Sequence, residues 1–134
     1  MSQDNILIIE VHKSAEEIFN FAINPKNTPI WLPAILEEKT SEWPPRVGTI
    51  YSQATDLGNG KKGSDAIIIT EYIPYTRLAF KSKTSTYRCS YDFEEKDGVT
   101  RLVYTENSGN AAGLESPFSQ ESLEKLKALI ETSV

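Results

Sequence analysis

The spacing of apolar positions changes along the chain, and each change predicts a different element. Residues 5–11 form a β-branched apolar run, which is typical of a strand buried on at least one side. Apolar residues then recur at helical spacing over residues 15–22, and the capping box formed by Ser14 and Glu17 predicts that a helix begins there. We expect this helix to end before Pro25, because a residue that precedes proline is pushed out of the α region.

A short second helix and a long series of strands are expected next. Pro29 suits the first position of a helix, so we predict a helix of at most about two turns, with Thr28 as its N-cap and Leu32 near its end. Beyond it, turn residues interrupt the chain roughly every ten positions, which is typical of a meandering antiparallel sheet. The strongest hairpin signal is Asp97-Gly98. Six strands are predicted, at residues 36–43, 49–56, 64–73, 77–83, 87–95 and 99–107, with a flexible hairpin tip at 58–63.

An amphipathic helix is predicted at the end of the chain. Residues 108–114 are small and include glycine, which indicates a linker. Ser116 then precedes a helix expected to run from Pro117 to Thr132, about 24 Å in length. Its apolar stripe consists of Leu123, Leu126, Leu129 and Ile130.

Alternation within the strands predicts which side chains face a common interior, because neighbours on a strand point to opposite faces. In strand 87–95 the mostly aromatic set is expected to face inward, and Phe80 belongs to the inward set of the strand before it. In the last strand we favour an inward set of Leu102, Tyr104 and Glu106, although the opposite set is also compatible with the pattern. The inward set of strand 87–95 is Tyr87, Cys89, Tyr91 and Phe93.

Length, charge and rare residues narrow the class of protein. The 134 residues predict one domain over residues 1–134. The 14 basic and 19 acidic residues give a net charge of −5, which argues against nucleic acid as the main partner and against a polybasic membrane anchor. One cysteine and one histidine exclude a disulfide framework and a metal site with three or four His/Cys ligands, so we expect no metal and no cofactor. No apolar stretch reaches the roughly 18 residues of a membrane span, and we expect a cytoplasmic protein.

The order of strand, two helices, six strands and helix resembles the helix-grip fold. This superfamily, also called SRPBCC, includes the START domains, the polyketide cyclase/dehydrase proteins and the plant pollen-allergen relatives. The resemblance implies an α+β fold, in which a seven-stranded antiparallel sheet curves around the C-terminal helix and encloses a mostly apolar cavity. The motifs that carry it concern packing and turns rather than chemistry. They are Ser14-Ala15-Glu16-Glu17-Ile18-Phe19-Asn20-Phe21, Asn24-Pro25-Lys26-Asn27, Trp31-Leu32-Pro33-Ala34-Ile35, Val47-Gly48-Thr49 and Tyr72-Ile73-Pro74-Tyr75-Thr76-Arg77-Leu78.

The resemblance makes the inward-facing residues candidate ligand contacts. Tyrosines on an apolar wall would supply the few oriented polar groups of a small-molecule pocket. The alternative is that they are core aromatics with hydroxyls bonded to backbone or water. Trp31 is placed where the second helix would cover the mouth of the cavity. The candidate ligand-binding residues are Trp31, Phe80, Tyr87, Cys89, Tyr91, Phe93, Leu102, Tyr104, Leu126 and Ile130.

Three functions remain open. We favour the binding of a small hydrophobic or amphipathic molecule, of lipid, polyketide or aromatic type, between the sheet and the C-terminal helix. The second is an enzyme of cyclase or dehydratase type that uses tyrosine and carboxylate groups as acid and base, with Glu106 as the candidate catalytic residue. The third is a protein-interaction module with a filled core, which would dock an acidic partner on Arg77, Lys81, Lys83 and Arg88 unless these residues form only a solvated outer face. A monomer or weak homodimer is expected, with no integral membrane association.

Overall fold

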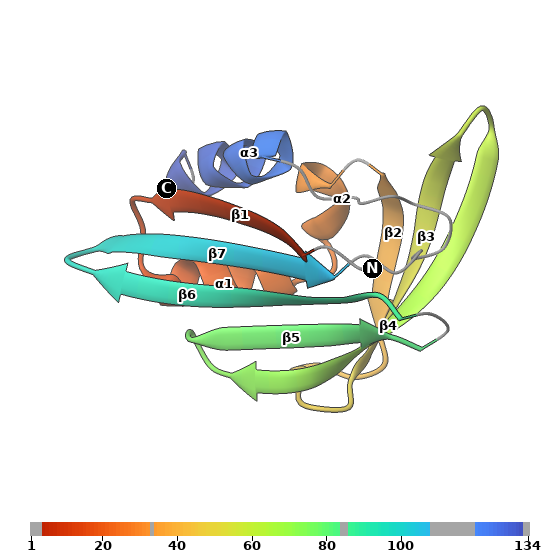
Figure 1. The fold of residues 1–134 in the computed structure, drawn as a ribbon, viewed down its shortest axis with the longest axis horizontal. Helices are drawn as coiled ribbons and strands as arrows, with labels where there is room; N and C mark the ends of the chain where they lie inside the picture. Colours follow the sequence, from red (N-terminus) through yellow and green to blue (C-terminus); the bar gives the residue numbers. More distant parts are fainter. Residues whose placement is uncertain (1–3, 33, 84–85, 108–119, 133–134) are drawn as a thin grey trace.

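The seven strands form one antiparallel sheet that curves around helices. The protein is described from a computed structural model covering residues 4–32, 34–83, 86–107 and 120–132. These residues confirm the predicted helix-grip arrangement, with two short helices after the first strand and a helix near the C-terminus (Figure 1). The elements are β1 (Asp4–Val11), α1 (Ala15–Ile23), α2 (Thr28–Trp31), β2 (Ile35–Thr40), β3 (Ile50–Gly58), β4 (Lys61–Ile73), β5 (Arg77–Ser82), β6 (Arg88–Lys96), β7 (Val99–Asn107) and α3 (Gln120–Glu131).

The sheet bends strongly along its strand order, which is β1-β7-β6-β5-β4-β3-β2. In Figure 1, strands β1, β7, β6 and β5 run almost horizontally, whereas β2 and β3 stand nearly upright. The register shifts once in each of three pairings: between Ile35 and Glu37, between Asp56 and Gly58, and between Ile69 and Glu71. Such bulges bend a strand and increase its twist, so they help to curve the β2–β5 part of the sheet.

Helix α3 covers the free edge of β1. Gln120 Nε2 donates to the carbonyl of Ile8 at 3.2 Å, and Lys127 Nζ donates to that of Glu10 at 2.9 Å. The backbone N–H of His12 donates to Glu131 Oε2 at 2.8 Å. Figure 1 shows α3 running beside β1. Backbone groups at this sheet edge, which would otherwise be available to another strand, are thereby occupied.

Local structure confirms several predicted signals. Ser14 caps α1 by accepting a hydrogen bond from the N–H of Glu17 at 3.2 Å, and α1 ends at Ile23, before Pro25. The Asp97-Gly98 turn has the positive φ angles, 55° and 80°, that a tight hairpin needs.

Three other predictions are corrected. The N-cap of α2 is Asn27 instead of Thr28, because the Thr28 hydroxyl donates to Glu38 at 2.6 Å. Strand β2 ends at Thr40, three residues before the predicted end. The predicted flexible tip at 58–63 is a tight turn at Asn59-Gly60, since these residues tolerate positive φ and let β4 begin at Lys61. The predicted linker and the start of the last helix fall on residues 108–119, outside the described part.

The Leu126→Ala substitution tests the packing of α3. Leu126 is completely buried, so its truncation should lower the free energy of unfolding by about 2–5 kcal/mol. Lys125→Ala, on the exposed side of the same turn, should change it by less than about 0.5 kcal/mol. Both values can be measured by urea unfolding. A loss below about 1 kcal/mol for Leu126→Ala would contradict the packing described here.

Candidate functional site

The predicted inward-facing residues all lie on the buried, concave side of the sheet. Strand register explains why, because Phe80 pairs with Cys89, and Tyr91 pairs with Tyr104. Leu126 and Ile130 of α3 are buried with them, and so is Trp31, which is only 1% exposed. A role for these residues in ligand contact remains a prediction. The ten residues are Trp31, Phe80, Tyr87, Cys89, Tyr91, Phe93, Leu102, Tyr104, Leu126 and Ile130.

A polar cluster of Tyr87, Tyr104 and Glu106 lies within this apolar face, near the end of β7. The phenol oxygens of Tyr87 and Tyr104 are 2.9 Å apart, and each lies 2.9 Å from Glu106 Oε2. Asn5 Nδ2 donates to the other carboxylate oxygen, Oε1, at 3.0 Å. Glu106 is 1% exposed, which confirms that it belongs to the inward set. Strands β1 and β7 and the residue that precedes β6 therefore bring donors to a carboxylate in the interior.

Burial raises the pKa of the phenol and thiol groups around Glu106 further above neutral pH. Loss of solvation raises the pKa of Tyr87 and of Tyr104 well above the ordinary value, and the negative charges that Cys89 and Glu106 would carry raise both further. Burial likewise raises the pKa of the Cys89 thiol to about 12. The two phenols can therefore act as hydrogen-bond donors, whereas Cys89 is poorly suited to act as a nucleophile.

A second carboxylate, Glu38 of β2, was not predicted for this face. It accepts hydrogen bonds from the Thr28 hydroxyl at 2.6 Å and from Gln53 Nε2 at 2.7 Å. Burial raises the pKa of Glu38, and these two hydrogen bonds offset part of that rise. Regular alternation from the buried Ile35 would point Glu37 inward. The bulge between Ile35 and Glu37 reverses the alternation and turns Glu38 inward instead.

A continuous series of aromatic rings links the surroundings of the two carboxylates. Tyr51 packs edge-to-face on Phe80, Phe80 on Tyr91, and Tyr91 on Tyr104, with ring centroids 5.3, 6.4 and 5.1 Å apart. The pKa of Tyr91 is raised mainly by burial, and then by the negative charges of Cys89, Glu38 and Glu106. The wall formed by Tyr51, Phe80, Tyr91 and Tyr104 therefore lies within the electrostatic influence of both acids.

Thr55 adds an unused polar group at the Glu38 end. It is 1% exposed and lies on the same face of β3 as Tyr51 and Gln53. Within the described part of the chain, its hydroxyl has no hydrogen-bond partner. An unsatisfied buried hydroxyl is unfavourable.

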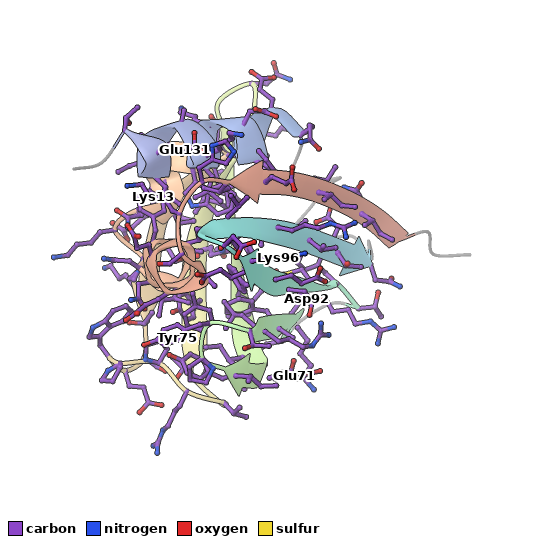
Figure 2. All side chains as sticks on the ribbon, turned by 90° about the vertical axis from the view of Figure 1, so that its left-hand side faces the viewer. Lys13, Glu71, Tyr75, Asp92, Lys96 and Glu131 are labelled. Atoms are coloured by element: carbon purple, nitrogen blue, oxygen red, sulfur yellow. The ribbon has the colours of Figure 1, made fainter. Side chains whose placement is uncertain are left out.

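The basic residues predicted as a docking patch include Arg77, which lies on the opposite, outer face. Arg77 donates to Glu71 at 2.7 Å and to both carboxylate oxygens of Asp92 at 2.8 Å. Figure 2 shows Glu71 and Asp92 on the side of the sheet away from α1. Lys81 and Arg88 face each other across β5 and β6 and line a depression of about 360 Å³. Arg77 is thus engaged within the chain, and a docking role for the patch, which also includes Lys83, remains a prediction.

Membrane-spanning helices and metal-binding clusters are both absent from the described residues. No helix formed by them is long and apolar enough to cross a membrane. Their histidine, cysteine, aspartate and glutamate side chains form no group of three that could hold a metal ion.

Comparison with solved structures supports the class of fold that this geometry defines. Protein CV1439 from Chromobacterium violaceum matches with a TM-score of 0.73 and 16% identity over 97% of this chain and 98% of its own. Protein NE0264 from Nitrosomonas europaea matches with a TM-score of 0.75 and 14% identity over 96% of this chain and 94% of its own. Ara h 8.0201 matches with a TM-score of 0.71 and 12% identity over 99% of this chain and 100% of its own. These matches show that the chain has the same fold as these proteins.

A family model narrows this assignment. Residues 12–131 match the model described as activator of Hsp90 ATPase homolog 1-like protein. The chain belongs to this family. A comparison with curated proteins gives no significant match.

Alkaline unfolding tests the burial of the tyrosines. A tyrosine whose pKa is raised in the folded state stays protonated there above pH 10, whereas the same tyrosine ionises in the unfolded chain. Its contribution to stability is therefore complete below pH 10 and is lost as the pH rises further. The free energy of unfolding should fall by about 1.4 kcal/mol per pH unit for each such tyrosine above about pH 10. Tyr87→Phe should reduce that slope in urea titrations at successive pH values. An unchanged slope would contradict the burial of Tyr87.

Proposed function

We propose that the protein binds a small hydrophobic or amphipathic molecule, of lipid, polyketide or aromatic type, between the concave face of the sheet and α3. The observation that carries this proposal is the cluster of Tyr87, Tyr104 and Glu106 on a buried aromatic face. Small-molecule sites are typically apolar with a few oriented polar groups, and this face has that composition.

The energetic cost of the cluster also supports a binding role. A buried carboxylate loses its hydration, and hydrogen bonds recover only part of that loss. Apolar side chains of similar volume often stabilise a core as well or better. Glu106 is one of the most deeply buried residues of the described chain, so its presence there is better explained by recognition than by stability.

Native mass spectrometry of gently purified protein tests the binding function. We expect a stoichiometric small molecule to remain bound and to be released by solvent extraction. Leu126→Ala and Tyr104→Phe should reduce its occupancy, whereas Lys125→Ala should not, because Lys125 is exposed. A ligand-free mass, together with no thermal shift from fatty acids, sterols or aromatic polyketides, would contradict the proposal and favour an interaction module.

A cyclase or dehydratase activity is the second candidate, and the contacts of Glu106 favour it. A carboxylate within hydrogen-bond distance of two protonated phenols provides a possible base and two possible acids. Such groups can direct proton transfer on a polyketide held in one conformation. No covalent intermediate is required, which agrees with the unreactive environment of Cys89.

Glu106→Gln separates the enzyme from the carrier. If Glu106 is the base, this variant should lose at least about 100-fold in kcat on a cyclisable polyketide while it still binds the product. Glu94→Gln, on the exposed part of β6, is the matched control and should retain full activity. Turnover by Glu106→Gln equal to that of the unmodified protein would exclude this catalytic role.

The family description makes interaction with a chaperone a further candidate, but the outer face gives it less support. Arg77 forms ion pairs with Glu71 and Asp92. Of the other predicted docking residues, Lys81 and Arg88 line the depression, and neither has an ion-pair partner in the described part of the chain. We therefore place the function on the concave face.

A further inference from the structure

The buried face carries acids without matching bases. Glu106 is buried and Glu38 is largely removed from solvent. In the described ranges, no lysine, arginine or histidine is buried. The protein thus offers hydrogen-bond acceptors to its interior, whereas its cationic groups lie at the surface.

The two acids lie at different ends of this interior. Glu106 belongs to β7, beside the edge strand β1, and Glu38 belongs to β2, the opposite edge strand. The aromatic wall of Tyr51, Phe80, Tyr91 and Tyr104 connects them through successive ring contacts. A molecule lying along this wall would meet an acceptor at either end.

At the Glu38 end, hydrogen bonds from the protein's own donors do not fully offset the burial of the carboxyl group. Burial raises the pKa of Glu38 although Thr28 and Gln53 both donate to it. The buried Thr55 hydroxyl on the adjacent strand also lacks a partner among the described residues. A donor from a ligand would improve the hydrogen bonding here, whereas a carboxylate or phosphate, which can only accept hydrogen bonds, would not.

We propose that the ligand has an aromatic or other cyclic apolar body carrying hydroxyl or amino groups, and carries neither a carboxylate nor a phosphate. This inference rests on the proposed binding function and specifies its ligand class. The apolar body would contact the aromatic wall, and the donors would reach Glu106 or Glu38. Anionic lipids and free fatty acids are excluded because two acids and no buried base face them.

Four naphthalenes that share one ring system test this inference. Binding of naphthalene, 2-naphthol, 2-(aminomethyl)naphthalene and 2-naphthoate is measured by isothermal titration calorimetry at pH 7. We expect 2-naphthol and the amine to bind at least about 10-fold more tightly than 2-naphthoate, and more tightly than naphthalene. Preferred binding of 2-naphthoate, or equal binding of naphthalene and 2-naphthol, would overturn the inference while leaving the binding function intact. Failure of all four to bind would count against both.

Two variants identify the acids responsible. Glu106→Gln and Glu38→Gln each replace a carboxyl group with a neutral amide of similar shape. At least one of them should therefore reduce the difference in affinity between 2-naphthol and 2-naphthoate about 10-fold. Glu94→Gln, on the exposed part of β6, should leave this difference unchanged. Using both variants keeps the test decisive if one of them fails to fold, which circular dichroism will show. If this difference in affinity is unchanged in every folded variant of Glu106 and Glu38, these acids do not select the ligand.

Discussion

Hydrogen bonding of the buried Glu106 carboxylate is the constraint on which the interior depends. Its donors come from β1, from β7 itself and from the residue that precedes β6, so three segments must keep one register. A slip of one residue in β7 would turn Glu106, Tyr104 and Leu102 to the outer face together. The same register that places the polar cluster therefore also buries the apolar core around it.

The curvature of the sheet and the packing of α3 bring the remaining groups to this interior. The bulge after Ile35 points Glu38 inward, and the aromatic wall continues from there towards Glu106. Helix α3 contributes Leu126 to the core, and its polar side chains bond the edge of β1. One helix thus covers part of the concave face and protects the sheet edge next to the polar cluster.

Local signals made most of the fold predictable. The capping box at Ser14, the Asp97-Gly98 turn and the alternation of strand β6 each depend on neighbouring residues, and the structure confirms them. The inward position of Glu106 also followed from alternation, because β7 has no bulge. Its partners Tyr87 and Asn5 could not be deduced, since their contacts depend on strand order.

Glu38 shows where such reasoning fails. A strand with two adjacent glutamates is usually interpreted as exposed, and the one-residue shift that turns Glu38 inward has no local signature. Thr28 is a related case, because its predicted capping role is replaced by a hydrogen bond to Glu38 that arises from tertiary structure. Glu38 and its hydrogen bond with Thr28 were therefore missed for a single physical reason.

The central proposal is that a small molecule binds between the concave face and α3, in contact with the polar cluster around Glu106. A high-resolution crystal structure of gently purified protein measures this most directly, through the electron density between α3 and strands β6 and β7. The account predicts density for a bound molecule, or for several ordered waters, within hydrogen-bond distance of Glu106, Tyr87 or Tyr104. Direct packing of side chains that leaves no room beside these residues for more than one water would contradict it.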